Sequence, residues 1–287
     1  MLKQALQIHL NLARASNLPT VASNALCACL LSGQFSLPIC AGAITAASLM
    51  YTGGMYLNDW SDANYDRQHR PERPIPAQQI SQKTVGLCAI AYFTLAVSIS
   101  LLISTSATLW LCLLLTTVVA YDLHHKNNTY SPLLMAACRA LLYPWAASLH
   151  SEALSADIFI AALGAFSYTL ALTWIARTPS LFKERPIPMG ALIALPAILW
   201  LAYTKGQLSA NTIATLSGFA LWCAYSLRGL YLRPLNAGFT IKNLIAGLCA
   251  VDLMALSFYG SLSPINSLLF IALLFSTLLL QKKISGT

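Results

Sequence analysis

Three carboxylates at regular spacing are the first feature of this sequence that suggests chemistry. Asp59, Asp62 and Asp66 fall within eight residues and make up a third of the nine acidic side chains in the chain. Their i, i+3, i+7 spacing places all three on one face of a helix. Such carboxylates repel one another unless a cation lies among them, and hard oxygen ligands suit Mg²⁺. The cluster therefore predicts a magnesium site, with a solvated acidic helix end as the alternative.

Polar and basic side chains flank this cluster. Asn58 precedes it, and Arg67, Arg70 and Arg73 follow it. Guanidinium groups bind phosphate oxygens through paired hydrogen bonds, and Mg²⁺ usually shares its coordination shell with substrate phosphates. We therefore expect a diphosphate site, with Arg70 and Arg73 as phosphate partners and Asn58 fixing the metal or a phosphate oxygen.

The elements that must position these residues are apolar segments. Only 9% of the 287 residues are charged and 57% are hydrophobic, too few charges to cover a water-soluble globule of this size. This composition excludes a cytosolic enzyme, a disordered chain and a secreted disulfide scaffold. We expect an all-α polytopic membrane bundle, forming a single domain over residues 1–287. It has ten spans, or nine if a terminal segment does not cross, at 18–37, 39–57, 84–104, 107–121, 132–149, 156–176, 189–204, 210–227, 241–259 and 264–281.

Basic residues gather on one side of this predicted bundle. Fifteen of the 17 Lys and Arg residues fall at the termini or in even-numbered loops, which predicts a cytoplasmic N-terminus and a cytoplasmic aspartate cluster. The net charge of +8 is thus a topology signal, and no nucleic-acid partner is expected. Residues 1–19 are expected to form an amphipathic helix at the membrane interface, not a signal peptide. A bacterial inner or plasma membrane is the expected location.

Several motifs resemble one known family. The pattern NDxxDxxxD at residues 58–66 resembles the first aspartate-rich motif of the UbiA superfamily of intramembrane prenyltransferases. HRPERPIP at 69–76 is similar to the stretch that follows that motif, and Tyr121 and Lys126 resemble its tyrosine-plus-basic signature. Residues 17–24 resemble the first span of an EboC-like branch. The resemblance covers most of the chain.

The resemblance implies a UbiA-like fold and a transferase activity of the EC 2.5.1 type. A prenyl diphosphate would be the donor, and an isoprenoid chain would pass to an acceptor that the sequence does not identify. Mg²⁺ would be held by the three aspartates, which together with Lys126 would be the catalytic residues. Tyr121 is a candidate orienting hydroxyl among the substrate-binding residues, and Asp122 is a candidate base on the acceptor side. Membrane lipids would surround the bundle.

An internal repeat departs from the family pattern. ERPIP at residues 72–76 recurs at 184–188, an offset of 112 that predicts two related halves. The family normally carries a second aspartate-rich motif in the second half, and this sequence has Arg177 and Lys183 there instead. We expect these two residues either to oppose the diphosphate as fixed positive charge or to be only cytoplasmic anchors beside a weakened site.

Two ionisable residues, Arg139 and Asp252, lie within predicted spans. A charge at the bilayer centre is costly unless it is satisfied, so we expect both to face the bundle interior and to pair with each other or reach polar backbone. Four aromatic side chains on the second and fifth predicted spans are candidates to line the cavity and stabilise a carbocation, with packing in the core or at the lipid interface as the alternative. They are Tyr51, Tyr56, Tyr143 and Trp145.

A noncatalytic, transport or lipid-binding protein on the same fold is the alternative interpretation. Internal repeats and intramembrane charges are also typical of transporters. The acidic cluster, however, falls at a predicted helix end, whereas transporters tend to place their sites near the bilayer midplane. This position favours the transferase.

Overall fold

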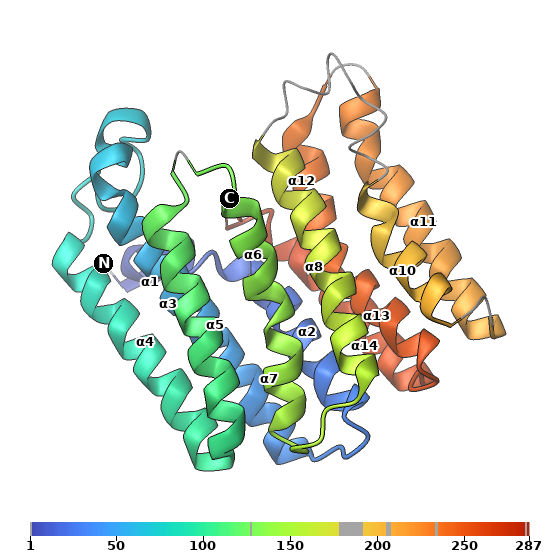
Figure 1. Cartoon of the computed structure of the whole chain (residues 1–287). Coiled ribbons are helices and arrows are strands. Elements are labelled where there is room, and N and C mark those ends of the chain that lie inside the picture. The colour runs from blue at the N-terminus through green and yellow to red at the C-terminus, as the bar shows by residue number, and fades with distance from the viewer. Residues whose placement is uncertain are drawn as a thin grey trace.

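The chain forms a bundle of helices (Figure 1). The computed structural model describes residues 2–126, 128–177, 192–204, 208–232, 235–284 and 286, and no strand occurs within them. The all-α prediction is therefore confirmed. The elements are α1 (Leu2–Leu12), the 3₁₀ turn η1 (Ala15–Asn17), α2 (Leu18–Leu31), α3 (Leu37–His69), α4 (Gln82–Ile103), α5 (Thr105–His124), α6 (Ser131–Ala140), α7 (Leu142–Ser148), α8 (Ala156–Arg177), the 3₁₀ turn η3 (Leu192–Ala194), α10 (Leu195–Tyr203), α11 (Ala210–Tyr231), α12 (Ala237–Ala246), α13 (Leu248–Phe258) and α14 (Pro264–Leu280).

Each predicted span coincides with helix in the described part of the chain. Five stretches are long and apolar enough to cross a membrane, namely α3, α4, α5, α8 and the combined stretch Ala237–Phe258. The fifth predicted span is divided between α6 and α7, because Pro144 has no N–H to continue the hydrogen-bond ladder to Ala140. The ninth is divided between α12 and α13 at Gly247. Whether the bundle has nine or ten spans stays a prediction.

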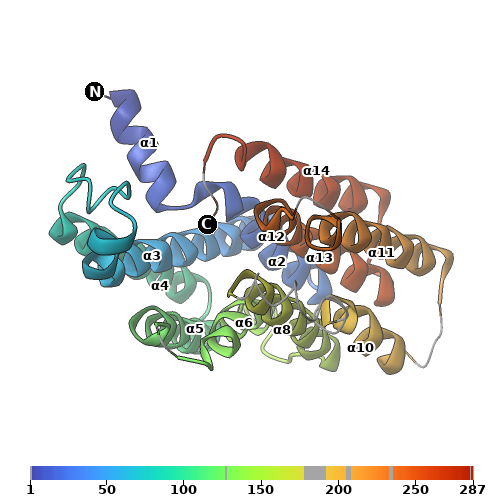
Figure 2. The same ribbon diagram turned by 90° about the horizontal axis from the view of Figure 1, so that it is seen from above.

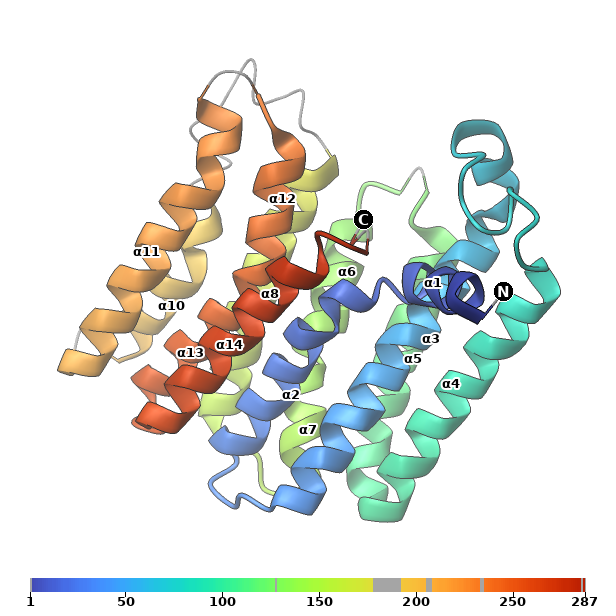
Figure 3. The ribbon, with the colours of Figure 1, turned by 180° about the vertical axis from the view of Figure 1, so that it is seen from behind.

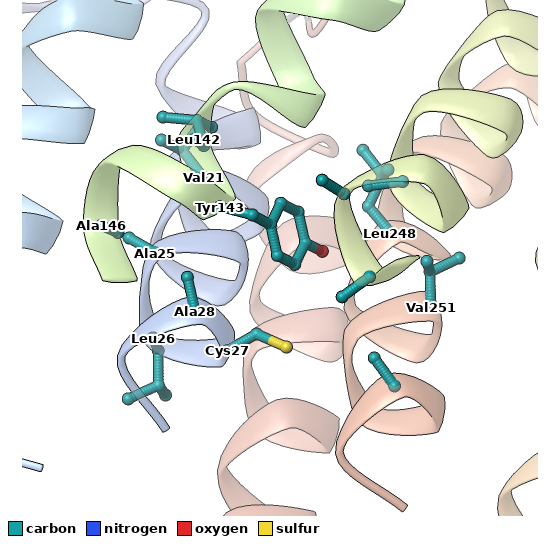
Figure 4. Close-up of a cluster of buried hydrophobic side chains, with 14 of the residues drawn as sticks. Val21, Ala25, Leu26, Cys27, Ala28, Leu142, Tyr143, Ala146, Leu248 and Val251 are labelled. Atoms are coloured by element: carbon teal, nitrogen blue, oxygen red, sulfur yellow. The ribbon is translucent and has the colours of Figure 1, made fainter. Parts of the chain in front are cut away.

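The helices stand in two rows. Seen from above, α5, α6, α8 and α10 form one row, and α3, α2, α13 and α11 form the other, with α14 on its outer face (Figure 2). The core between the rows contains large, fully buried side chains such as Tyr143, Trp145 and Trp200. The Tyr143 ring projects from α7 between α2 and α13 (Figure 4). The two rows are therefore joined by packed aromatic side chains.

The N-terminal helix lies across the long helices of the bundle (Figure 3). One face of α1 contacts α3, where His9 Nδ1 lies 2.7 Å from the hydroxyl of Tyr56, and Leu12 is fully buried. The opposite face is exposed. This agrees with the amphipathic helix expected from residues 1–19, while its place at a membrane interface stays a prediction.

Helix α3 carries the acidic motif from the bundle into the loop at its end. It runs unbroken for 33 residues and stops at His69, because the residue before Pro71 disfavours helical backbone. The helix predicted at the three aspartates is therefore confirmed, and it continues the second predicted span through them. Helices α3, α5, α8 and α11 all end at the same end of the bundle (Figure 1), which agrees with the charge asymmetry of the sequence. Which membrane face this end occupies stays a prediction.

Candidate active site

The three aspartates are buried at the end of α3. Asp59, Asp62 and Asp66 are 7%, 8% and 2% exposed, and Asn58 is 8% exposed. A solvated acidic helix end would leave these carboxylates in water, so that alternative is wrong. Buried carboxylates need opposite charges or hydrogen-bond donors. Two groups of cationic side chains provide them.

Two arginines form ion pairs with Asp59 and Asp66. Arg73 Nη1 lies 3.1 Å from Asp59 Oδ1 and 3.0 Å from Asp66 Oδ2. Arg14 Nη2 lies 3.0 Å from the same Asp59 oxygen and donates to Asn58 Oδ1 at 3.2 Å. Arg14 has a left-handed backbone (φ 41°) between α1 and η1, which turns the chain toward α2. A non-glycine residue in this region is strained, and such strain often marks a functional site.

Asp62 is paired with two cationic or titratable residues that directly follow α5, His125 and Lys126. Lys126 Nζ lies 2.8 Å from Asp62 Oδ1, and it also sits over the Tyr65 ring, 3.8 Å from the ring centroid. His125 Nε2 lies 3.4 Å from Asp62 Oδ2, and this hydrogen bond raises the pKa of His125 above its usual value. Tyr121 stacks on the His125 ring with centroids 5.2 Å apart. The predicted residues Tyr121 and Lys126 are thus brought to the aspartate motif.

The donor set suits Mg²⁺ in part. The oxygens of Asp59 and Asp66 converge on one atom, Arg73 Nη1, and Mg²⁺ in proteins is commonly bound by one or two carboxylates with phosphate and water completing its shell. Within the described residues no three His, Cys, Asp or Glu side chains form a ready metal cage. A metal held by all three aspartates would require Asp62 to leave Lys126 and His125, so that ligand set stays a prediction.

A small cavity opens one helical turn below the motif. It occupies about 90 Å³ between α2, α3, α5, α6 and α7. Its wall is mostly apolar, with Met50, Met55, Leu114 and Leu142 among the lining side chains. The lining polar side chains are those of Tyr51, Tyr121, Asp122 and Arg139. Asn58 Nδ2 donates to Asp122 Oδ1 at 3.2 Å, so the motif and the cavity share a wall.

The other predicted site residues lie outside this group. Arg70 is exposed at the end of α3 and makes no ion pair with a described carboxylate. Arg177, the last residue of α8, is also exposed and donates to the carbonyl oxygen of Asn128 at 3.0 Å and to the hydroxyl of Ser131. Lys183 lies outside the described residues. The roles predicted for these three basic side chains therefore stay predictions.

One of the four aromatic candidates lines the cavity. Tyr51 does so, and Asn17 donates to its hydroxyl at 3.2 Å. Tyr56 packs instead against Tyr92, and Trp145 donates its indole N–H to Ser100. Tyr143 donates to Asp252. The position of an aromatic residue along its own helix does not show whether its side chain lines a cavity or packs against another helix.

The two intramembrane charges face the bundle interior, as predicted, but they are joined through a third residue. Asn24 accepts a hydrogen bond from Arg139 Nη1 at 2.8 Å and donates from its own Nδ2 to both carboxylate oxygens of Asp252, at 2.9 and 2.8 Å. Ser23 and Tyr143 also donate to Asp252, which is fully buried. Arg139 and Asp252 thus satisfy their charges through α2.

Arg14 and His125 are residues of the candidate site that sequence reasoning missed. The sequence explains Arg14 by topology alone, since a positive-inside pattern requires basic residues before the first span. Its contact with Asp59 joins residues 45 positions apart, and no spacing rule predicts it. Of the adjacent residues His124 and His125, His124 is exposed, while His125 turns toward Asp62.

The fold and the site together define a membrane-embedded helical bundle with a charged motif at the mouth of an apolar cavity. The profile of the UbiA prenyltransferase family matches residues 17–240. The chain therefore belongs to this family, and the resemblance read from its motifs is confirmed. Because the family is membrane-embedded and five helical stretches suit a bilayer, the chain is an integral membrane protein. Its assignment to an EboC-like branch stays a prediction.

Relatives and solved structures agree with this family. Digeranylgeranylglyceryl phosphate synthase of Saccharolobus solfataricus is 30% identical over 174 residues, which are 58% of this chain and 60% of that protein. A UbiA homologue from Aeropyrum pernix matches with TM-score 0.67 and 16% identity over 84% of this chain and 96% of its own. A UbiA homologue from Archaeoglobus fulgidus bound to GPP and Mg²⁺ matches with TM-score 0.54 and 15% identity over 94% of this chain and 99% of its own. At these identities the structures show the fold alone.

Proposed function

We propose that this chain transfers an isoprenoid chain from a prenyl diphosphate to an acceptor at the α3 motif. The observation that carries this proposal is the meeting of three buried carboxylates with Arg14, Arg73 and Lys126 at the mouth of an apolar cavity. A prenyl diphosphate needs cationic side chains for its diphosphate and an apolar cavity for its isoprenoid tail, and here the two lie side by side. The solved homologue bound to GPP and Mg²⁺ supports the same donor class.

The chain's own cations bind and orient the donor in this proposal. Arg73 and Lys126 exchange carboxylate oxygens for diphosphate oxygens, and their positive charge stabilises the negative charge that develops as the C1–O bond breaks. Asp59 and Asp66, released from Arg73, would hold Mg²⁺, which when bound neutralises the leaving diphosphate. The surrounding apolar wall excludes water from the allylic cation.

The acceptor is a nucleophile that approaches from the cavity side. Asp122 lines the cavity and is 3% exposed, so it is placed to take the proton of an acceptor hydroxyl. The relative from Saccharolobus solfataricus is named for a glyceryl phosphate product, which makes a glycerol-based alcohol the first acceptor to test. We expect the motif to face the cytoplasm, where soluble diphosphates are available.

Pyrophosphate release by the purified protein tests this function. Prenyl diphosphates of increasing length are offered with a lysate of small-molecule acceptors, with and without Mg²⁺. Asp62→Asn is compared with Asp157→Asn, an aspartate at the far end of α8 that accepts a hydrogen bond from Tyr203. We expect release to need Mg²⁺ and to fall about a hundredfold or more in Asp62→Asn only.

The same assay separates the alternatives. Donor binding without release by the wild-type protein would favour a noncatalytic site that has lost its second aspartate motif. Absence of donor binding would overturn the transferase and favour a transport or lipid-binding role. Mass spectrometry of the product names the acceptor where release occurs.

A further inference from the structure

Arg14 reaches the aspartate motif from a strained turn outside the long helices. Its Nη2 lies 3.0 Å from Asp59 Oδ1 and 3.2 Å from Asn58 Oδ1. The backbone at Arg14 is left-handed (φ 41°), a conformation that a residue with a Cβ keeps only where its surroundings enforce it. Contacts that fix the η1 turn therefore also fix the direction of this guanidinium.

Asn17 is the last residue of this turn, and it is buried. Its backbone N–H donates to the carbonyl oxygen of Arg14 at 3.0 Å, which closes η1. Its side-chain Nδ2 donates to the Tyr51 hydroxyl on α3 at 3.2 Å and to the carbonyl oxygen of Gly286 at 2.9 Å. Its Oδ1 accepts a hydrogen bond from Gln281 Nε2 at 3.4 Å. Asn17 thus connects the turn that carries Arg14 with the residues that follow α14.

The residues after α14 return over the start of α2 (Figure 3). We call Gln281–Ile284 together with Gly286 the α14 tail. Gln281 and Ile284 are buried, and Ile284 belongs to the same apolar cluster as Leu12 at the end of α1. The two lysines between them are exposed. The α14 tail therefore buries the side that faces η1 and leaves its charged side exposed.

Gly286 approaches η1 too closely to carry a side chain. A Cβ at this position would lie 2.9 Å from Asn17 Oδ1 and 3.2 Å from Ser16 Oγ. Nonbonded heavy atoms are most stable at about 3.5–4.0 Å, so a methyl group would push the Asn17 amide away from its partners. The glycine at residue 286 therefore allows its own carbonyl oxygen to meet Asn17.

We infer that the α14 tail holds η1 in place and that Asn17 is a positioning residue for Arg14 in donor binding. Arg14 fixes Asn58 and Asp59 at the end of α3, and the tail fixes Arg14 through Asn17. When the tail contact is lost, the guanidinium is free to leave these two side chains, and the motif loses the geometry that binds the diphosphate. This inference rests on the proposed function, because Asn58 and Asp59 meet a prenyl diphosphate only in that function.

A double-mutant cycle on donor binding tests this inference. The Kd of geranyl diphosphate with Mg²⁺ is measured for the full chain in lipid nanodiscs, for Asn17→Ala, for Arg14→Gln and for the double variant. We expect each single substitution to raise Kd by about tenfold. The double variant should match Arg14→Gln within about twofold, because both substitutions act through one guanidinium. In turnover, KM for the donor rises with Kd while kcat falls by less than about twofold.

A pair of glycine substitutions tests the tail itself. Gly286→Ala places a methyl group against Asn17 and is expected to raise Kd by about fivefold or more. Gly218→Ala on α11 is the matched control, because a Cβ there meets no neighbouring side chain or helix within 4 Å, and it leaves Kd unchanged. Without donor, amide hydrogen exchange at η1 should become faster in Gly286→Ala and stay at the wild-type rate in Gly218→Ala.

Two outcomes overturn the inference alone. One is an unchanged Kd in Asn17→Ala beside normal turnover, and the other is independent weakening by the two substitutions in the double variant, which would mark Asn17 as a packing residue only. If Asn17→Ala does not fold, Gly286→Ala takes its place in the cycle with Arg14→Gln. Coupled donor binding without any pyrophosphate release would keep the role of the tail and refute the proposed transfer. A wild-type protein that does not bind geranyl diphosphate would refute both.

Discussion

Asp252 is the hydrogen-bond acceptor on which the junction of α2, α7 and α13 depends. Ser23, Asn24 and Tyr143 all donate to its carboxylate, and the residue is fully buried. Asn24 also accepts a hydrogen bond from Arg139, so the network links both intramembrane charges. Replacing Asp252 with alanine removes the acceptor that these three side chains share. Their donor groups would then face one another without an acceptor between them.

The expected loss follows from the number of bonds. Asp252 accepts four hydrogen bonds, two of them from Asn24. Side-chain hydrogen bonds inside membrane proteins contribute about 0.6 kcal/mol on average and up to about 1.7. Four such bonds give about 2.4 kcal/mol, and poor accommodation of the freed donors raises the expected loss to about 3–4 kcal/mol for Asp252→Ala. Asp252→Asn keeps one acceptor oxygen and is expected to lose about half as much.

Unfolding in mixed micelles measures this loss. The free energy of unfolding is followed by tryptophan fluorescence as the fraction of dodecyl sulfate rises. Asp157→Ala is the control, because its one side-chain hydrogen bond, from Tyr203, is exposed and should contribute within about 0.5 kcal/mol. The reasoning is refuted if Asp252→Ala shifts the unfolding transition no further than Asp157→Ala does.

Two more predictions follow from contacts elsewhere in the bundle. Arg73→Gln is expected to raise KM for the prenyl diphosphate by about tenfold. Arg67→Gln is the control and leaves KM unchanged, because the Arg67 guanidinium donates to Asn64 and Gln82 and to none of the three aspartates. Equal effects of the two substitutions in steady-state assays would contradict the assignment of Arg73. Gly164→Ala places a methyl group 2.6 Å from the Trp200 ring and is expected to lower the free energy of unfolding by about 1–3 kcal/mol through overpacking. A free energy of unfolding in micelles equal to that of the wild type would show that the Trp200 ring moves aside without cost.

The sequence carries enough information to place α3 and its motif. Apolar composition predicts helices in a bilayer, and the absence of proline between Pro38 and Pro71 predicts that the second span continues through Asp59, Asp62 and Asp66. Both follow from local rules, which depend on spacing and backbone geometry within one element. The breaks between α6 and α7 and between α12 and α13 were missed because apolar residues continue across them.

The partners of the site residues could not be predicted in the same way. Asp59 meets Arg14, and Asp252 meets Asn24, across 45 and 228 positions of the chain. Such contacts depend on how helices turn against their neighbours, and the periodicity of a single helix does not contain this information. Arg70 and Arg73 illustrate the limit. They are three residues apart in one basic stretch, yet only Arg73 folds back onto the aspartates.

The charge balance at the motif explains how one site can be stable both empty and loaded. Arg14, Arg73 and Lys126 neutralise three buried carboxylates. A diphosphate brings negative charge to these cations, and the carboxylates then lose their partners unless positive charge arrives with the ligand. Donor binding and divalent cation binding are therefore coupled by electrostatics, each favouring the other. Either ligand alone would leave buried charges of one sign unpaired, so the site should accept the two together.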